Sequence, residues 1–312
     1  MKVTQDIKIK KHKNSVWHDV AKYRGLYLIF LPTLLWYLIF MYVPMFGNII
    51  AFQDYSITRG FLASKFVGLE NFRDFFNNYK FFELLRNTIT ITGLNLVIGF
   101  PLPIILALLL NEVKSIRYKK TIQTVTYLPY FISSVVMVSM LMLFVSGDGI
   151  FNKVRMSMGL ESVPFMTTPE YFPWIYVFSN IWQHLGWNSI IYIAAIAGVD
   201  QELYEAAQID GAGRWKQTLH ITLPGISSTI IILLIMQIGQ MLTVGYEKII
   251  LMYNPSIYST ADVISTYVYR KGLIESDYSY STTVSLFNSA CNFILLMSAN
   301  GISKKLSGEG LW

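Results

Sequence analysis

The chain has 312 residues, of which 53% are hydrophobic and only 14% are charged, whereas charged residues make up about 25% of an ordinary soluble domain. This composition excludes a typical soluble enzyme and indicates a protein embedded in a membrane. The formal charge of +6 does not indicate a nucleic-acid-binding protein, because the basic residues cluster beside apolar segments.

The N-terminal segment, residues 1–24, is polar and basic, and it contains Lys8, Lys10, Lys11 and Lys13. The apolar run that follows is too long for the central part of a cleaved signal peptide. We therefore expect residues 1–24 to form a basic cytoplasmic segment rather than a signal peptide.

Six stretches reach the roughly 20 mostly apolar residues that a helix needs to cross a bilayer. They lie near residues 25–50, 88–110, 124–146, 172–198, 219–246 and 281–303. We predict an all-α integral membrane protein with six transmembrane helices in a single domain, residues 25–306, followed by a short cytoplasmic tail, residues 307–312. The fourth stretch is interrupted by polar residues, so one side of it should face protein or water: Asn180, Gln183, His184 and Asn188.

The distribution of lysine and arginine predicts the orientation of these spans, since cytoplasmic loops carry an excess of both residues. The N-terminus, residues 111–123, residues 199–218 and residues 304–312 after the last span together hold fifteen of the 25 basic residues. We therefore place both termini and the loop at residues 199–218 in the cytoplasm, with the protein in the cell membrane.

The loop at residues 199–218 overlaps an unusual polar sequence at residues 205–225, EAAQIDGAGRWKQTLHITLPG. Asp200 is suited to cap a helix that runs to about Asp210, and Gly211 and Gly213 should then break it. A second short helix should follow, with Pro224 at the point where the next span begins. The sequence predicts a compact helix-turn-helix on the cytoplasmic face, which we call the connector, residues 199–218.

The spacing of this segment resembles the EAA signature of membrane permeases in ATP-binding-cassette (ABC) importers. The matching positions are Glu205, Ala206, Ala207, Gly211, Ile221, Leu223 and Pro224. An ordinary helical hairpin that caps the spans is the alternative, but it gives no reason for this spacing. The resemblance implies the fold of a type I ABC importer permease.

Flanking segments resemble the sugar permeases within this family. YVPMFGNIIAFQDYS and FVGLENFRDFF are similar to permeases that import complex oligosaccharides, including polysaccharide fragments. TYLPYFISSVVM and NIWQHLGWNSIIYIAAIAGVDQELYEAA are similar to maltose-type permeases. The resemblance covers about residues 20–305 and implies an oligosaccharide as the transported solute.

In this family the EAA segment fits a groove on the cytoplasmic ATPase subunit. Carried over, the docking element would consist of Glu205, Ala206, Ala207, Asp210, Gly211, Ala212 and Gly213. The phosphate-binding motif GxxxxGK[ST] is absent from the sequence, so ATP and Mg²⁺ would be bound by partner subunits. The resemblance implies a second, nonidentical permease, two ATPase subunits and an external solute-binding lipoprotein.

The resemblance to maltose-type permeases also implies a solute path lined by Gln183, His184, Trp187, Gln237, Gln240, Met241 and Val244. On the sequence alone, Gln237 and Gln240 are three residues apart and share one helix face. Intramembrane amides also join neighbouring helices, and Trp187 could serve in ordinary packing. Both interpretations remain open at this point.

Three other functions were weighed against a sugar importer. An importer for an amino acid or phosphate has the same architecture. A membrane-embedded transferase requires a cluster of catalytic or metal-binding groups, and we assign no catalytic residue and no metal site because the four histidines are dispersed and Cys291 is the single cysteine. A proton-coupled carrier requires carboxylates in the middle of the spans, and these are missing.

Overall fold

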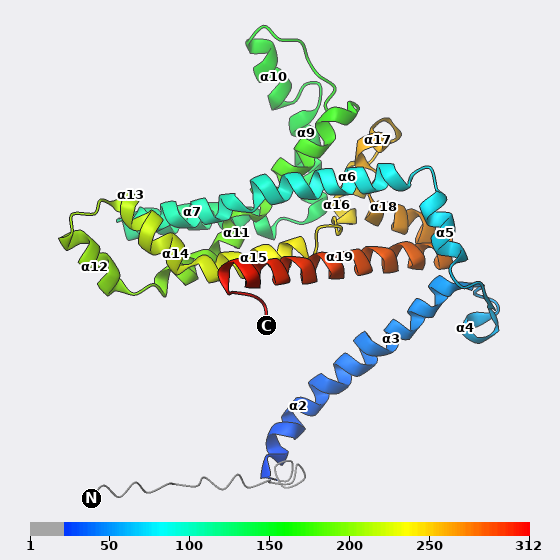
Figure 1. Ribbon diagram of the computed structural model, residues 1–312. Coiled ribbons are helices and arrows are strands. Elements are labelled where there is room, and N and C mark those ends of the chain that lie inside the picture. Colours follow the sequence, from blue (N-terminus) through cyan, green and yellow to red (C-terminus); the bar gives the residue numbers. More distant parts are fainter. Residues whose placement is uncertain (1–21) are drawn as a thin grey trace, which may run out of the picture.

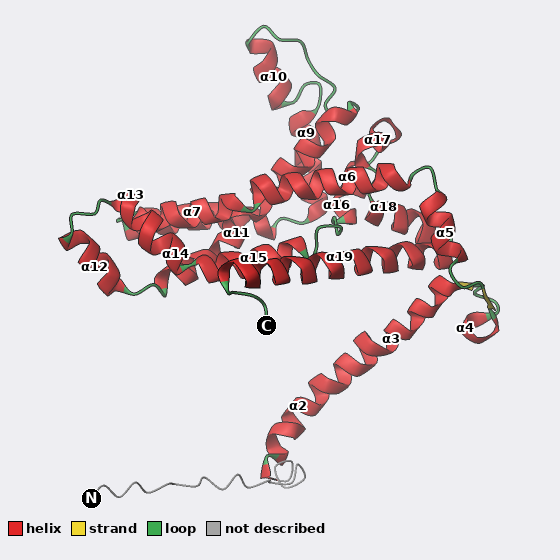
Figure 2. Ribbon diagram, in the orientation of Figure 1, coloured by secondary structure: helices red, strands yellow, loops and turns green. Residues whose placement is uncertain are grey.

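The computed structural model describes residues 22–312, so nearly all of the basic segment predicted at residues 1–24 lies outside the described residues. The described chain is helical along most of its length (Figure 2). Within it, the only strands are β1 (Gln53–Asp54) and β2 (Lys65–Phe66), which pair antiparallel with Gln53 opposite Phe66. The predicted all-α membrane fold is confirmed.

The centre of the structure is a bundle of long helices (Figure 1). A helix interrupted by a π-helical turn consists of α6 (Phe81–Leu94), η3 (Asn95–Gly99) and α7 (Pro101–Glu112). It packs against α11 (Phe172–Ala197), while α15 (Ser227–Ile238) packs against α19 (Tyr278–Ser307). Apolar side chains also cover the outer surfaces of these helices, as expected for helices surrounded by lipid.

The first span stands apart from this bundle (Figure 1). It consists of α2 (Arg24–Tyr37), η1 (Leu38–Tyr42), α3 (Val43–Met45) and η2 (Phe46–Phe52), and only η2 packs against α19. Every residue of α2 is exposed although the helix is strongly apolar. Its apolar surface must therefore be covered by lipid or by another chain.

Four helical segments among the described residues are long and apolar enough to cross a membrane: Arg24–Phe52, Phe81–Glu112, Ser134–Ser157 and Tyr278–Ser307. A fifth is added if Arg214–Gly225 and Ser227–Ile238, which meet at a bend of 60°, form one span. The predicted fourth span is the 26-residue helix α11, whose polar residues reduce its hydropathy. The described residues thus contain four or five helices of this kind, and the predicted number of six apolar spans is not confirmed.

Two predicted spans differ from the structure because local sequence breaks them. The third, residues 124–146, contains the end of α8 (Ile116–Tyr127), a turn η4 (Leu128–Phe131) around Pro129, and α9 (Ser134–Val145). The fifth, residues 219–246, bends at Ile226 after η6 (Thr218–Thr222) and α14 (Leu223–Gly225), and its helix already ends at Ile238. Prolines that cannot donate a backbone hydrogen bond lie at both interruptions.

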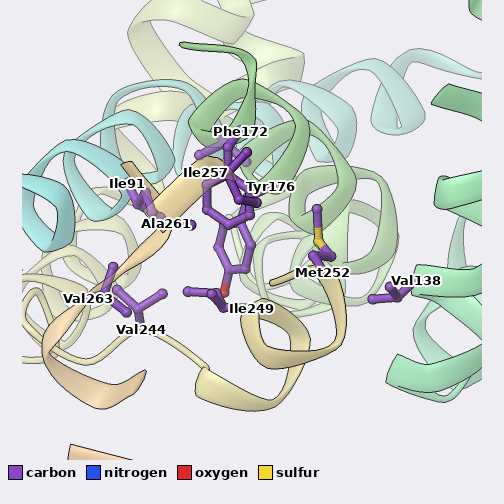
Figure 3. Close-up of a cluster of buried hydrophobic side chains, with 11 residues drawn as sticks. Ile91, Val138, Phe172, Tyr176, Val244, Ile249, Met252, Ile257, Ala261 and Val263 are labelled. Atoms are coloured by element: carbon purple, nitrogen blue, oxygen red, sulfur yellow. The ribbon is translucent and has the colours of Figure 1, made fainter. Parts of the chain in front are cut away.

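Short helices gather at the end of the bundle farthest from the connector (Figure 1). They are α4 (Gly60–Ala63), α5 (Glu70–Asn77), η5 (Pro169–Tyr171), α16 (Tyr246–Met252), η7 (Pro255–Ile257), α17 (Tyr258–Ala261), α18 (Ile264–Tyr269) and η8 (Arg270–Ile274). Helix α10 (Ile150–Ser157) follows α9 and projects away from the bundle. Figure 3 shows the apolar cluster that joins α6, α9 and α11 to these short helices.

A buried carboxylate organises the polar part of the same region. Asp262 is fully buried and accepts hydrogen bonds from the Tyr253 hydroxyl at 2.7 Å and from Arg270 Nη2 at 2.7 Å. Thr266 donates a further bond, and Lys80 Nζ lies 3.5 Å from the carboxylate. A buried charge is tolerated only with such compensation, so Asp262 fixes α18 and η8 against the start of α6.

The backbones of α8 and α11 approach each other closely at Gly186. A Cβ atom added at Gly186 would lie 2.2 Å from the backbone oxygen of Thr126, which is far inside van der Waals contact. The small residue therefore permits these two helices to touch, as glycine does in many membrane helix pairs.

We predict that Gly186→Ala lowers the thermal stability of the detergent-purified protein, because α8 and α11 must separate to accommodate the methyl group. Overpacking of this kind costs about 1–3 kcal/mol. Gly93→Ala in α6 is the matched control, since its added Cβ meets nothing within 4 Å. Equal melting temperatures for Gly186→Ala and Gly93→Ala would contradict the packing described above.

Candidate functional site

The connector forms the helix-turn-helix that the sequence predicts. Helix α12 spans Gln201–Ile209, and the Asp200 carboxylate accepts a hydrogen bond from the Glu202 backbone amide at 3.0 Å. Helix α13 spans Arg214–Gln217 and continues through η6 toward the bent fifth span. In Figure 1 the connector is the extreme tip of the bundle.

Of the two glycines at the turn, only Gly211 has a conformation that requires glycine. Its φ is +74°, whereas Gly213 has a φ of −68°. The Gly211 amide donates to the Gln208 oxygen at 3.1 Å, and the Ala212 amide donates to the Ala207 oxygen at 2.8 Å. This pair of bonds is the Schellman motif that ends a helix at a left-handed residue, and it fixes the angle of the turn.

The connector surface is uncovered. Of the seven predicted docking residues, Ala207 and Ala212 are partly buried and the other five are exposed: Glu205, Ala206, Asp210, Gly211 and Gly213. Beside them, Ile209 is 87% exposed and Trp215 is 74% exposed. Large apolar side chains grouped on an otherwise polar tip indicate a contact with another protein.

Sequence reasoning missed Ile209 and Trp215 as part of this surface. The available signal was the presence of bulky apolar residues in a segment that was otherwise polar. Their exposure was not decidable from the sequence, because the same residues could have packed back against the spans.

Side-chain contacts join the connector to the bundle. The hydroxyls of Tyr204 and Thr222 are 2.8 Å apart, and Arg214 lies 3.5 Å from Glu112 at the end of α7. Inside the connector, Gln217 Nε2 donates to the Ala212 oxygen at 2.8 Å. A displacement of α12 would therefore be passed to α7 and to the start of the bent fifth span.

A cavity of about 380 Å³ lies between the second, fourth and fifth predicted spans. Four of the seven predicted path residues contribute to its wall: His184 on α11, and Gln237, Gln240 and Met241 at the end of α15 and in the turn beyond it. Its polar groups suit a ligand that forms many hydrogen bonds, and its apolar groups suit contact with C–H surfaces.

The other three predicted path residues lie elsewhere. Gln183 is buried and donates to the Ile132 backbone oxygen at 3.1 Å. The Trp187 ring stacks on Tyr130 with ring centroids 4.4 Å apart, and Val244 belongs to the apolar cluster of Figure 3. None of the three contributes to the wall of the 380 Å³ cavity.

The cavity also contains polar residues that were not assigned to the path: Asn95, Asn180, Asn188, Thr92 and Thr243. Asn180 Nδ2 donates to Asn95 Oδ1 at 3.2 Å, and His184 Nδ1 lies 2.9 Å from the Asn180 backbone oxygen. Asn180 and Asn188 belong to the polar strip recognised in the sequence. Asn95 gave no such signal, because a single amide in an apolar run is equally suited to bonding a neighbouring helix.

The chain matches known transport proteins over most of its length. Residues 99–306 match the family described as binding-protein-dependent transport system inner membrane component. The chain is 49% identical to protein LplB of Bacillus subtilis (strain 168), covering 93% of this chain and 91% of that protein. It is 46% identical to the polygalacturonan/rhamnogalacturonan transport system permease protein YteP of the same organism, covering 97% of this chain and 95% of that protein.

Two solved structures have the same fold. One is a bacterial alginate ABC transporter in complex with an alginate pentasaccharide-bound periplasmic protein, with a TM-score of 0.87, 42% identity and coverage of 96% of this chain and 100% of that chain. The other is a bacterial ABC transporter involved in the import of the acidic polysaccharide alginate. Its TM-score is 0.85 and its identity is 43%, with coverage of 93% of this chain and 99% of that chain.

Proposed function

The chain belongs to the family of binding-protein-dependent transport system inner membrane components, and on that premise we propose that it is the permease subunit of an ABC importer for oligosaccharides. Its role is to form part of the solute path and to couple ATP hydrolysis by separate subunits to uptake. Family membership argues against the membrane-embedded transferase, since the family consists of transport components.

The observation that carries the proposal is the exposed connector. A rigid turn at Gly211, with Ile209 and Trp215 uncovered beside it, supports docking to a cytoplasmic ATPase subunit. In this proposal Glu205 orients the segment through its exposed carboxylate, and Ala206 and Ala207 permit close approach. ATP and Mg²⁺ are bound by the ATPase subunits, which use the connector to move α7 and the fifth span.

The cavity supports an oligosaccharide as the solute. A sugar leaving water exchanges its hydrogen bonds for those of polar side chains, and buried polar groups must be compensated in this way. Gln237, Gln240 and His184 provide such groups in one cavity. The relative named for polygalacturonan/rhamnogalacturonan transport favours this assignment over an amino acid or phosphate.

The partners follow from the same premise. The exposed apolar helix α2 is suited to packing against a second permease, which we propose is nonidentical. Two ATPase subunits and an external solute-binding lipoprotein complete the assembly. The excess of basic residues supports cytoplasmic termini, and in that orientation the connector lies on the side of the membrane where ATP is available.

We predict that Gly211→Pro abolishes uptake and solute-stimulated ATP hydrolysis without reducing the amount of protein in the membrane. Proline restricts φ to about −65° and has no amide hydrogen, so it is incompatible with both the φ of +74° and the bond to Gln208. Gly301→Ala on α19 is the control, since this exposed glycine lies outside the connector and its added Cβ meets nothing within 4 Å. Full coupled hydrolysis in Gly211→Pro would count against the docking role.

We predict that Gln237→Ala combined with Gln240→Ala reduces uptake at least about tenfold, which corresponds to about 1.4 kcal/mol of lost stabilisation. Association with the ATPase subunits should be unchanged, because neither glutamine belongs to the connector. Gln123→Ala in α8 removes a comparable amide outside the cavity and should retain normal uptake. Normal uptake by the double variant would indicate that both glutamines serve in packing and do not bind the solute.

We predict that deletion of this chain from its intact transport operon abolishes growth on, and uptake of, an oligosaccharide. Uptake of amino acids and phosphate by the same cells should be unchanged. The measurement is a screen of labelled solutes with and without the restored chain. Loss of amino acid or phosphate uptake, with all oligosaccharides unaffected, would overturn the proposed function.

A further inference from the structure

A buried lysine lies just beyond the turn that follows α15. Lys248 on α16 is only 7% exposed. Its Nζ has no hydrogen-bond partner among residues 22–312. A buried ammonium without a partner is costly, so this side chain requires an explanation that packing alone does not provide.

The surroundings of Lys248 supply an aromatic face but no carboxylate. Its Nζ lies 5.5 Å from the centre of the Tyr176 ring on α11, a cation–π distance. The buried carboxylate nearby in sequence, Asp262, is already bound by Arg270, Lys80 and Tyr253. Within the described residues, Lys248 takes part in no ion pair with an acidic side chain.

Helix α11 connects this lysine to the cavity. Tyr176, Asn180 and His184 are spaced four residues apart and therefore follow one face of the helix. Asn180 and His184 contribute to the cavity wall, and Tyr176, one turn before Asn180, is the residue whose ring faces the Lys248 ammonium. Thr243, five residues before Lys248, also contributes to the wall. The ammonium is therefore located beside the end of the cavity farthest from the connector.

The segment that precedes the lysine reaches the surface of the described structure. Thr243, Gly245 and Tyr246 are exposed there, and Thr243 also borders the cavity. Lysine has a flexible four-carbon stem and three donors, so a change of rotamer is sufficient to bring Nζ toward a bound ligand.

The charge of Lys248 is sensitive to such a ligand. Burial lowers the pKa of the Lys248 ammonium to about 8, so the group is still mainly protonated at neutral pH. An anionic ligand favours the charged form and offsets the cost of its burial. A neutral ligand leaves that cost uncompensated.

We propose that the transported oligosaccharide carries carboxylate groups, as in a chain of uronic acids, and that Lys248 binds one of these carboxylates beside the path. The inference rests on the proposed function and specifies its substrate class. The amides of the cavity then bind hydroxyl groups, while Lys248 distinguishes acidic from neutral sugars. The import of an acidic polysaccharide by a transporter with the same fold is consistent with this role.

The test compares two probes that differ in charge: trigalacturonate and its fully methyl-esterified form. Cells carrying the complete operon take up each labelled probe, with this chain either wild type or altered. In Lys248→Met we expect the ratio of acid uptake to ester uptake to fall at least about tenfold, whereas Lys248→Arg retains most of the acid uptake because it keeps the charge. Lys153→Met, which removes an exposed lysine on α10, should leave the ratio unchanged.

Membrane abundance and basal ATP hydrolysis of Lys248→Met should equal those of the wild type, which separates loss of recognition from loss of folding. An unchanged ratio in Lys248→Met overturns the proposal. So does a wild-type transporter that takes up neutral oligosaccharides alone, and in that case the proposed function still stands. If the wild type takes up no oligosaccharide, the proposed function itself fails.

Discussion

The absence of water inside a bilayer is the constraint on which the rest of this structure depends. Every backbone amide and carbonyl there needs a partner within the protein, which leaves helices as the available element for this chain. The same constraint applies to side chains. Asn180 donates a hydrogen bond to Asn95, and Gln237 and Gln240 both contribute to the wall of one cavity.

In the proposed function, the part of the chain outside the bilayer meets a different requirement, which is to transmit force through a small contact. The Schellman turn at Gly211 fixes the shape of the connector. Tyr204 and Arg214 then attach it to separate parts of the bundle. A connector attached in this way would move as a unit. A partner bound to α12 would therefore also act on α7 and on the bent fifth span. Ligand-driven switching needs such a difference in interaction between two states.

The helix interruptions lie near the connector and the cavity. The fifth span bends by 60° near Ile226, directly after the connector, and α15 ends beside the cavity at Ile238. The π-helical turn η3, Asn95–Gly99, borders the same cavity. By contrast, the far end of the bundle is fixed by Asp262 and by the apolar cluster of Figure 3. One end of the bundle is thus firmly packed, and the helices at the other end are interrupted.

The membrane class, most span positions and the connector were predictable from local sequence. Bilayer thickness sets the length of an apolar run, and the turn at Gly211 depends on neighbouring residues alone. Which polar residues share a cavity, by contrast, depends on how distant helices pack together. Gln183 and His184 are adjacent, yet the former bonds Ile132 and the latter faces the cavity, because the neighbouring helices on each side differ. The burial of Lys248 without a partner likewise depends on residues distant in sequence, whose arrangement no local pattern specifies.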